Sequence, residues 1–345
     1  MAVIIPCAGR SSRYPGTRPK YLLTLYDGSL MFEKAAQPYL EYTDVHFIIL
    51  KEHEEQYNVT DIFERIYSDD NSRVHIHILE EETSGPAETV YCITKTLDPD
   101  EPVFIKDCDS FFDAPLKINN HVCVADLREN LNVTKVASKS FAVANEQNML
   151  TGIIEKSVSS NYICVGGYGF SSAQLYNQSF ESLQHITDEI FVSHVIQQLL
   201  HNDIFEIDLV GNYIDVGTYE EFVAYNQGKP TIFCDIDGTV FYNQSQHFDN
   251  HHGIKPEPIP NAVNYLLKKQ QAGSKLVFTT SRKEKFKEIT VTALKDCGFN
   301  NFEVIFDMPH APRMIINDNS ITNPYPTAIA LNVPRDDNDY WSKIS

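Results

Sequence analysis

Short apolar segments alternate with segments of helical periodicity along the whole chain. The apolar segments have the length and the β-branched content of buried strands, and the others place apolar residues at the spacing of one helix face. In the first two-thirds of the chain, the expected strands are 3–7, 45–50, 74–79, 103–106, 122–126, 133–138 and 162–170, and the expected helices are 31–42, 56–67, 87–97, 172–183 and 189–201. Such alternation predicts an α/β fold, in which a mixed, mostly parallel sheet carries helices on both faces.

A polar segment at 225–230, which contains Gly228 and Pro230, separates this pattern from a second, smaller one. Gly and Pro interrupt regular structure, so we place a domain boundary here. A chain of 345 residues also exceeds the usual size of one hydrophobic core. We therefore expect two Rossmann-like domains, 1–228 and 229–345, the second with a small parallel sheet. Its expected strands are 231–234, 276–280, 314–317 and 327–332, and its expected helices are 261–271 and 286–297.

The charge of the chain narrows the classes of partner. A formal net charge of −19 argues against nucleic acid and anionic membrane as partners. It does not argue against phosphorylated substrates, because Arg10, Arg13, Arg18 and Lys20 form a local basic cluster. No apolar run approaches the roughly 20 residues that cross a bilayer, and the N-terminus lacks the basic start of a secretion signal. We expect no membrane insertion and a cytoplasmic location.

The cysteines and histidines give little sign of a soft-metal site. The seven cysteines are an odd number and include no Cys-x-x-Cys pair, which favours buried free thiols over a disulfide framework or a zinc site. One histidine-rich tract lies at 245–252. A metal site there is one interpretation, and a polar surface loop is the favoured one.

Residues 231–240 carry the most specific chemical pattern. Four mostly apolar residues lead to Asp235 and Asp237, which are followed by a Gly-Thr turn. Two carboxylates at the end of a strand suit phosphoryl transfer, because one can attack phosphorus while the other handles the proton of the leaving group. A divalent metal ion between the carboxylates and the phosphate would assist.

The loop after the first expected strand reads Pro-Cys-Ala-Gly-Arg-Ser-Ser-Arg at 6–13. A turn of small residues, such as Ala8 and Gly9, frees backbone N–H groups to hold anionic oxygens. Arg13 and Lys20 would add full charges against a triphosphate. A surface turn with solvated arginines would look similar, and the loop alone does not decide between the two.

Two further acids in the same domain lie at the ends of short, mostly apolar segments. Asp109 closes the segment 104–109, and Asp215 precedes a Val-Gly-Thr turn and a following helix. Oxygen ligands of this kind readily hold a hard divalent cation. Each acid taken alone is better explained as a strand-end cap or a turn residue than as a metal ligand. Their occurrence together with the basic loop favours a site.

In this combination the chain resembles the sugar-nucleotidyltransferase family, which joins a nucleoside triphosphate to a phosphorylated sugar or alcohol. The resemblance covers about residues 1–228. The opening loop matches the signature Ala-Gly-x-Gly-Ser/Thr-Arg…Pro-Lys at Ala8, Gly9, Ser12, Arg13, Pro19 and Lys20. The resemblance implies an N-terminal nucleotidyltransferase domain with a mixed sheet, in which this loop binds the nucleotide.

Other segments are similar to further functional positions of that family. Gly85, in Ser-Gly-Pro-Ala-Glu, falls in its base-recognition turn, and Lys156 falls at the lysine that meets the phosphate of the acceptor. Gly167 falls in its acceptor-site strand. The resemblance also implies that Asp109 and Asp215 bind Mg²⁺. It further implies an in-line attack of the acceptor's phosphate oxygen on the α-phosphorus, with release of pyrophosphate.

The chain departs from that family pattern at two positions. Ser11 stands where the signature has its second glycine, which bears on how closely the loop approaches the phosphates. The asparagine expected before the acceptor-site glycine is absent, with Val165 nearby, so the acceptor is left open. The compact domain mildly favours a small acceptor, and we favour CTP, with UTP or dTTP as alternatives.

The C-terminal segment resembles the haloacid dehalogenase (HAD) phosphatase superfamily. Asp235 and Asp237 match its first motif, and Thr280 ends a strand like that of its second motif, where a Thr holds the phosphoryl oxygen. Asp318 falls at the acid that completes the Mg²⁺ site, or is a turn residue. Arg313 stands near the position of the lysine that is usual in the third motif of the superfamily. A solvated surface charge is an equally good explanation of this arginine.

The HAD resemblance implies a mechanism through an aspartyl-phosphate. Asp235 would be the nucleophile, and Asp237 would be the general acid and then the base that activates water. Asp235, Asp237 and Asp318 would be the metal ligands. Because 229–345 leaves room for no large cap, the segment between 240 and 260 is the one candidate flap, and water exclusion falls to the other domain or a second subunit of a homo-oligomer.

Taken together, the sequence predicts a bifunctional Mg²⁺-dependent enzyme. It would transfer a nucleotide from a nucleoside triphosphate to a phosphorylated sugar or polyol and hydrolyse a phosphomonoester, for an activated precursor of a surface or capsular polysaccharide. An alternative is a phosphatase alone, with a degenerate first domain that binds or senses nucleotide sugars. A non-catalytic sensor or scaffold is a third class, which the five metal-site acids disfavour.

Overall fold

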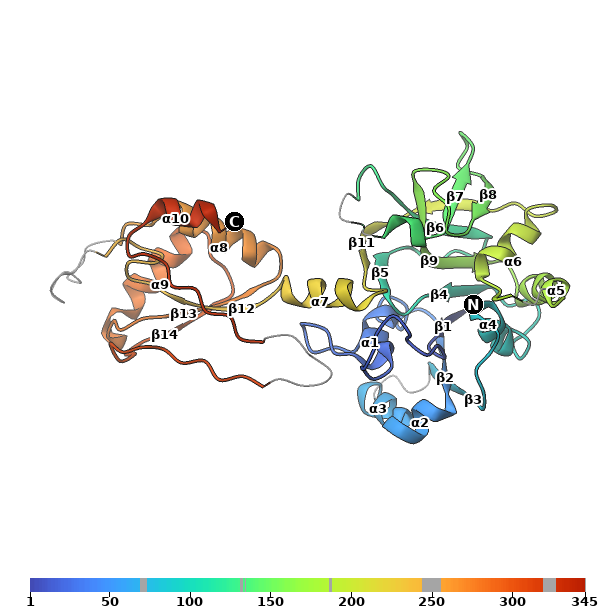
Figure 1. The fold of residues 1–345 in the computed structure, drawn as a ribbon, viewed down its shortest axis with the longest axis horizontal. Coiled ribbons are helices and arrows are strands. Elements are labelled where there is room, and N and C mark those ends of the chain that lie inside the picture. Colours follow the sequence, from blue (N-terminus) through green and yellow to red (C-terminus); the bar gives the residue numbers. More distant parts are fainter. Residues whose placement is uncertain are drawn as a thin grey trace. The chain divides into compact units, whose positions relative to one another are not determined.

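The computed structural model describes residues 1–68, 73–130, 133, 135–185, 188–243, 256–318 and 327–344. The chain divides into two compact units, Met1–Phe222 and Val223–Ser345 (Figure 1). The division of functions between 1–228 and 229–345 stays a prediction. No helix in the described ranges has the length and the apolar composition that crossing a membrane requires.

A mixed sheet forms the centre of the N-terminal unit, as the sequence predicts. Its main path runs β10-β6-β9-β4-β1-β2-β3, and β7 and β8 extend it beside β9. The strands β1 to β4 and β10-β6 pair in parallel, whereas β9 runs antiparallel to both β4 and β6. The bounds are β1 Ala2–Pro6, β2 Asp44–Leu50, β3 Val74–Leu79, β4 Val103–Lys106, β6 His121–Asp126, β7 Phe141–Ala144, β8 Leu150–Ile154, β9 Tyr162–Phe170 and β10 Glu206–Leu209.

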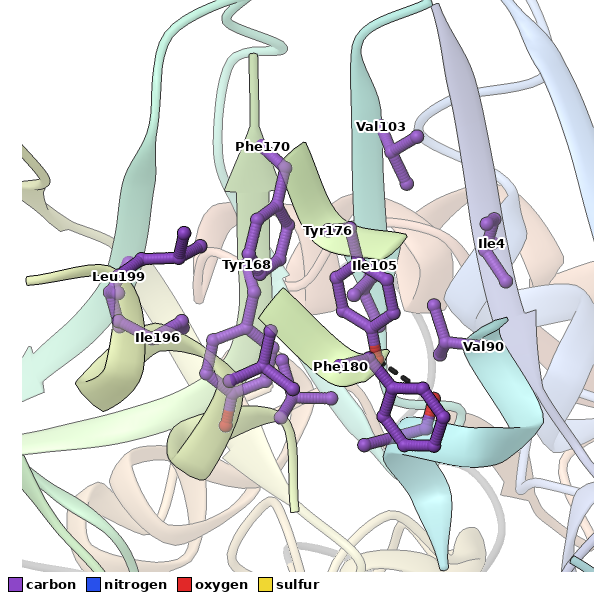
Figure 2. Packing of buried hydrophobic residues seen from close by; sticks show 14 of the residues in the cluster. Ile4, Val90, Val103, Ile105, Tyr168, Phe170, Tyr176, Phe180, Ile196 and Leu199 are labelled. Carbon is purple, nitrogen blue, oxygen red and sulfur yellow. Dashed lines mark hydrogen bonds between the residues drawn. The ribbon is translucent and has the colours of Figure 1, made fainter. Parts of the chain in front are cut away.

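Helices cover both faces of this sheet, which explains why its central strands are mostly apolar on both faces. Ile4 of β1 packs into one core layer with α4, α5 and α6, while Ile5 packs into the other with α1 and α3. In the first layer the Tyr176 hydroxyl donates to the Ala87 carbonyl at 2.8 Å (Figure 2). The bounds are α1 Met31–Ala36, α2 Lys51–Tyr57, α3 Val59–Ile66, α4 Pro86–Thr94, α5 Ala173–Leu183 and α6 Val192–Leu199.

Several helix ends have local causes. The helix α4 starts with Pro86 at its first position, where a missing N–H costs nothing, and the side chain of Ser172 caps α5 by accepting from Leu175 N at 3.1 Å. The expected helix 31–42 stops at Ala36, two residues before Pro38, whose ring disfavours a continuing helix. The expected helix 56–67 is in fact two helices, separated by Asn58 in the left-handed conformation.

The strand expected at 133–138 is wrong. Val136–Ser138 forms a single 3-10 turn, η2, which contributes no strand to the sheet. A two-stranded antiparallel ribbon that the sequence analysis did not predict lies beside the sheet instead. It consists of β5 (Ser110–Asp113) and β11 (Gly211–Asp215). This ribbon follows the end of β4 directly and so determines where the acids at 107–109 lie.

The C-terminal unit contains a parallel three-stranded sheet. Its strand order is β12-β13-β14, and its apolar core includes Ile236, Phe278 and Phe299. Its strands are β12 Thr231–Asp235, β13 Lys275–Thr279 and β14 Phe302–Ile305, and its helices are α8 Pro260–Gln271, α9 Lys287–Asp296 and α10 Asn338–Lys343, with α7 Tyr219–Gln227 crossing the division between the units. A HAD-like identity of this unit stays a prediction.

Two strands expected in the C-terminal unit are wrong within the described residues. The segment 312–318 has no regular structure, and Met314 and Ile316 are 81% and 82% exposed. Two prolines, at 309 and 312, precede it and cannot donate to a strand ladder. The described part of 327–332 is also irregular, with Ile329 exposed. The strand at 302–305 occupies the third sheet position instead.

All seven cysteines are free thiols, and five of them are buried. The histidine-rich tract 245–252 lies outside the described residues, as does most of the expected flap between 240 and 260.

Three histidines of β2 and β3 form a stacked cluster at one side of the sheet. The rings of His46 and His75 lie 4.6 Å apart, and His46 Nδ1 lies 3.0 Å from His77 Nε2. Burial, together with the neighbouring imidazoles, lowers the pKa of His46 to about 4. The folded protein therefore keeps His46 neutral at pH values where the unfolded chain, with a pKa near 6.5, takes up a proton.

This difference predicts a loss of stability in acid. The contribution of neutral His46 is complete above about pH 6.5 and is lost as the pH falls towards 4, by up to about 3 kcal/mol. Denaturant unfolding at a series of pH values should show a shallower acid loss in His46→Gln than in the wild type. The matched variant His201→Gln, at an exposed position, should keep the wild-type slope. Equal slopes in all three proteins would contradict this assignment.

Candidate functional site

The loop after β1 is held in place at two points. Ser11 adopts a φ of 53°, in the left-handed region that favours glycine, so the loop keeps a glycine-like turn although a serine stands here. The Ser11 hydroxyl accepts from the backbone N–H of Lys20 at 2.9 Å. The buried Tyr14 donates its hydroxyl to the Val216 carbonyl, which fastens the loop to the chain that follows β11.

The other loop residues identified from the sequence lie at its surface or its root. Ala8 is buried at the end of β1, whereas Gly9, Ser12 and Arg13 are exposed. A side chain at Gly9 would meet no atom within 4 Å, so the space above this turn is open. The loop thus presents backbone and cationic groups towards open space, as an anion-binding turn requires.

The ribbon of β5 and β11 brings Asp109 and Asp215 side by side. Ser110 pairs with Asp215 in the ribbon, and Val216 N donates to the Asp109 carbonyl at 2.9 Å. A Cβ atom at Gly217 would lie 3.0 Å from Asp215 Oδ1 and 3.4 Å from Asp109 Oδ2. Both carboxylates therefore border the same small space, which only a glycine leaves free.

Each carboxylate of this pair is neutralised by a lysine. Lys20 Nζ lies 2.5 Å from Asp109 Oδ2, and Lys139 Nζ forms an ion pair with Asp215 Oδ2. A terminal nitrogen of Arg13 lies 3.8 Å from the Gly217 Cβ position, at the edge of the same space. Acidic and basic groups thus alternate around this space. We call Asp109 and Asp215 the acidic pair.

The charges of the site follow from burial and pairing. Burial would raise the pKa of Asp109, but the charge and hydrogen bond of Lys20 outweigh it and hold this pKa well below its usual range. Burial and the nearby charge of Asp109 raise the pKa of Asp107 to about 6. Burial also raises the pKa of Asp215, which the charge of Lys139 opposes. Asp109 is therefore the most firmly ionised acid of the three.

Lys139 was not among the candidates from the sequence. It follows η2 in an irregular segment, and no motif marks it, because its partner Asp215 lies 76 residues further along the chain. Lys156, which was a candidate, is exposed with a φ of 52°, and its ammonium group lies 4.5 Å from the centre of the Phe191 ring. Its backbone N–H donates to the Lys139 carbonyl at 3.1 Å, which connects it to the site.

Two of the three candidate glycines mark close approaches of the backbone. A Cβ at Gly85, which directly precedes α4, would lie 2.9 Å from the Ile190 carbonyl oxygen. A Cβ at Gly167 of β9 would lie 2.7 Å from the Phe112 ring. Packing alone therefore explains why these positions are glycine, and their role in substrate binding stays a prediction.

The donors of the acidic pair fit a hard divalent cation. Carboxylate oxygens from two chain segments converge there, and Mg²⁺ characteristically uses one or two carboxylates and completes its shell with waters and phosphates. Among the described residues, Asp109 and Asp215 do not join a third acid, histidine or cysteine in a close group of three ligand atoms. The site therefore suits a metal that arrives with a phosphate ligand.

In the C-terminal unit the structure brings four of the five predicted residues together. Arg313 Nη2 lies 2.9 Å from Asp235 Oδ1, and the Thr280 hydroxyl donates to Asp237 Oδ2 at 3.1 Å. Burial raises the pKa of Asp235, and the nearby charge of Asp237 raises it further. The Gly238 turn has a φ of 85°, which favours glycine.

Arg282 is a residue of this cluster to which the sequence analysis gave no role. It is 6% exposed and contacts both carboxylate oxygens of Asp237, with Nη2 at 2.6 Å from Oδ1. Its other terminal nitrogen donates to the Thr290 hydroxyl at 3.0 Å. The forked contact fixes the orientation of Asp237. Its position two residues after Thr280 was the one available signal.

Asp318 lies apart from this cluster. The strand expected to carry it is absent, and the residue is exposed in an irregular segment, where its carbonyl accepts from the Thr327 hydroxyl at 2.5 Å. In the described part of the chain, Asp318 does not form a close group of ligand atoms with Asp235 and Asp237. The three-acid magnesium site is therefore not assembled here, and the assignment of Asp318 as a ligand stays a prediction.

No protein-family model and no curated protein sequence matches the chain. Solved structures do. A nucleoside-diphosphate-sugar pyrophosphorylase from Vibrio cholerae RC9 matches with a TM-score of 0.56 and 20% identity, over 65% of this chain and 99% of that one. A putative glucose-1-phosphate thymidylyltransferase from Bacillus anthracis matches with a TM-score of 0.54 and 18% identity, over 66% of this chain and 94% of that one. UTP-bound UGPase from Acinetobacter baumannii matches with a TM-score of 0.50 and 16% identity, over 66% of this chain and 92% of that one.

The similar structures are nucleotidyltransferases, and the match covers about two-thirds of the chain. At 20% identity or less, such a match shows the fold. The nucleotidyltransferase-like fold predicted for the N-terminal domain is therefore confirmed, whereas the HAD resemblance of the remainder stays a prediction.

The space between the two carboxylates can be tested by filling it. In Gly217→Ala the new methyl group would stand between Asp109 and Asp215, and we expect roughly 10-fold weaker binding of Mn²⁺, a spectroscopic substitute for Mg²⁺. Electron paramagnetic resonance titration measures this affinity. Gly211→Ala is the matched control, because a Cβ there meets no atom within 4 Å. Unchanged Mn²⁺ affinity in a folded Gly217→Ala protein would show that the ion does not bind between these acids.

Proposed function

We propose that the N-terminal unit catalyses nucleotidyl transfer from a nucleoside triphosphate to a phosphorylated sugar or small polyol. The observation that carries this proposal is the convergence of Asp109 and Asp215 on the space at Gly217, with Lys20, Lys139 and Arg13 around it. Oxygen ligands for a metal and cations for a polyphosphate thus border a single space. The nucleotidyltransferase fold agrees with this chemistry.

The lysines would change partners when the nucleotide binds. In the substrate-free protein Lys20 and Lys139 neutralise the acids. A triphosphate brings several negative charges, which compete for the two ammonium groups and for the Arg13 guanidinium. The carboxylates released in this exchange become available to a cation. The ion pairs of the free protein are therefore a resting state that keeps buried charges compensated until substrate arrives.

Asp109 and Asp215 would hold Mg²⁺, and the bound ion would screen the negative charge of the phosphates. Arg13 and Lys20 would orient the triphosphate, together with the backbone N–H groups of the loop that follows β1. Lys156 would position the phosphate of the acceptor, an assignment that its backbone contact with Lys139 supports. None of these residues forms a covalent bond with substrate, so positioning and charge compensation account for their contribution.

The proposed reaction forms one phosphorus–oxygen bond and breaks another. An oxygen of the acceptor phosphate attacks the α-phosphorus of the nucleotide, and the bond between the α-phosphorus and the bridging oxygen breaks. Pyrophosphate leaves with the electron pair of that bond. A nucleoside diphosphate linked to the sugar or polyol remains. CTP is the favoured nucleotide, with UTP and dTTP as alternatives, and a role in surface or capsular polysaccharide synthesis stays a prediction.

Replacement of Asp109 tests this proposal. Asp109→Ala removes one oxygen ligand and leaves Lys20 without its partner, so pyrophosphate release should fall at least about 100-fold. The measurement uses each nucleoside triphosphate with a panel of sugar and polyol phosphates and Mg²⁺. Asp113→Ala, an exposed acid on the adjacent β5, is the matched control. Pyrophosphate release at the wild-type rate by folded Asp109→Ala would rule out this site.

For the C-terminal unit we propose phosphomonoester hydrolysis. The supporting observation is that Asp235 is flanked by Arg313 at 2.9 Å, while Thr280 and Arg282 orient Asp237. Asp235 would attack the phosphorus atom and form an aspartyl-phosphate as the alcohol leaves. Asp237 would donate the proton to that alcohol and then accept one from the attacking water. Arg313 would take the place of the lysine usual in the superfamily.

The same assays distinguish two alternative functions, one with a single activity and one with none. Phosphate release without pyrophosphate release from any pair of substrates would favour a phosphatase whose N-terminal unit binds or senses nucleotide sugars. Absence of both would favour a non-catalytic sensor or scaffold.

The phosphatase proposal has its own test. Asp235→Asn keeps the size of the side chain and removes the nucleophile, so phosphate release should be abolished while pyrophosphate release continues at the wild-type rate. A colorimetric phosphate assay with generic phosphomonoesters measures the first activity. Asp307→Asn, an exposed acid paired with Lys283, should behave like the wild type. Phosphate release that survives in Asp235→Asn would refute the nucleophile assignment, and loss of both products in the folded variant would refute two separate sites.

A further inference from the structure

A second group of metal-ligating side chains lies inside the N-terminal sheet, and neither proposed activity uses it. His121 and Cys123 of β6 and Asp208 of β10 offer a nitrogen, a sulfur and an oxygen atom, all within 4.8 Å of one another. His121 and Cys123 are fully buried, and Asp208 is half-buried. Among the described residues this is the one such group of three.

Strand geometry explains the convergence. Side chains two residues apart on a strand point to the same face, which places His121 and Cys123 together. In the parallel pair of β10 with β6, Asp208 stands opposite Cys123 and Glu206 stands opposite His121. The cluster therefore depends on the register of two paired strands, and no flexible loop contributes to it.

Two atoms of the cluster are buried without a hydrogen-bond partner in the described part of the chain. They are His121 Nε2 and Asp208 Oδ2. The other histidine nitrogen, Nδ1, lies 2.8 Å from the Asn119 carbonyl, an acceptor only, so Nδ1 carries the proton and Nε2 presents a lone pair. A buried polar atom left unpaired costs about 1–3 kcal/mol. Two of them in one cluster point to a missing cation.

The neighbouring strand leaves space for these side chains. A Cβ at Gly169 of β9 would overlap the His121 ring, and one at Gly167 would lie 2.9 Å from Cys123 Cβ. Across Gly169 the His121 ring stacks on Phe104 of β4, with 5.6 Å between centroids and 13° between planes. The ring is therefore held in one orientation. A carbonyl that accepts from the remote nitrogen of a fixed histidine is also the usual support of a metal ligand.

We propose that His121, Cys123 and Asp208 bind a divalent transition-metal ion of the Zn²⁺ class. Imidazole, thiolate and carboxylate together are ligands of Zn²⁺, whereas Mg²⁺ selects oxygen ligands. Tetrahedral zinc holds nitrogen and oxygen at about 2.0 Å and sulfur at about 2.3 Å, so ligand atoms that lie within 4.8 Å of one another would move closer together as the ion binds. Lys117, 3.1 Å from Asp208 Oδ1, marks the more exposed side, where water completes the coordination.

Metal binding has a defined proton and charge balance. Burial raises the pKa of Cys123 to about 12, so the thiol is protonated in the metal-free protein and its proton leaves to solvent when the ion binds. Thiolate and carboxylate then offset the two charges of the ion, and the ammonium group of Lys117 remains as a further positive charge at the more exposed edge. Because the ligands come from two strands, the ion would join the four-residue edge strand β10 to β6. The site is separate from the acidic pair.

Cobalt substitution tests this site on the full-length protein. Metal-free protein titrated with Co²⁺ in excess Mg²⁺ should develop thiolate-to-cobalt charge-transfer absorption at one equivalent, and Zn²⁺ should abolish it. Oxygen and nitrogen ligands, including those of the acidic pair and the histidine tract, give no such band. Absence of the band in the wild-type protein would overturn the proposal, whatever the variants do.

Variants identify the ligands. Cys123→Ala should lose the charge-transfer band, whereas Cys164→Ala, another buried thiol in the same sheet, should keep it. Asp208→Asn, at the more exposed side, should weaken Co²⁺ binding at least about 10-fold while the protein stays folded. Thermal unfolding with and without Zn²⁺ should show stabilisation of the wild type and of Cys164→Ala only. A band that persists in Cys123→Ala would overturn the assignment.

Discussion

Two ion pairs between lysines and aspartates make the N-terminal site physically feasible. Asp109 and Asp215 border the same space at Gly217, and carboxylates so close repel one another in a poorly solvated environment. Lys20 and Lys139 remove that repulsion. The same pairs tie the loop after β1 and the segment after η2 to the ribbon of β5 and β11. The local structure and the proposed recognition of substrate thus involve the same four charges.

The fold supplies these charges from parts of the chain that are remote in sequence. The central strands β1 and β4 end beside one another because they pair in parallel, and the ribbon then carries Asp215 back to the end of β4. Such an arrangement at the ends of central strands is typical of ligand sites in α/β folds. Two glycines of β9, Gly167 and Gly169, also leave space for side chains of β6 on the neighbouring strand.

Sequence patterns predicted what is local. The strands 45–50, 74–79 and 103–106 are confirmed nearly to the residue, since largely apolar runs bounded by turns have few other structures available. Contacts between distant segments were not predictable. Lys139 and Arg282 meet their aspartates across 76 and 45 residues, and a charged residue in a loop has no periodicity to reveal it. The strand predicted at 314–317 is wrong because a strand also needs a neighbouring strand to pair with, which a local pattern does not specify.

The central claim is that the lysine–aspartate pairs are the resting state of a metal–nucleotide site. Crystals soaked with Mn²⁺ and CTP, measured for the anomalous scattering of manganese, test it most directly. We expect a manganese peak in contact with both Asp109 and Asp215, with the ammonium groups of Lys20 and Lys139 moved from the carboxylates to the phosphates. Bound CTP with both ion pairs intact and manganese located elsewhere would contradict the claim.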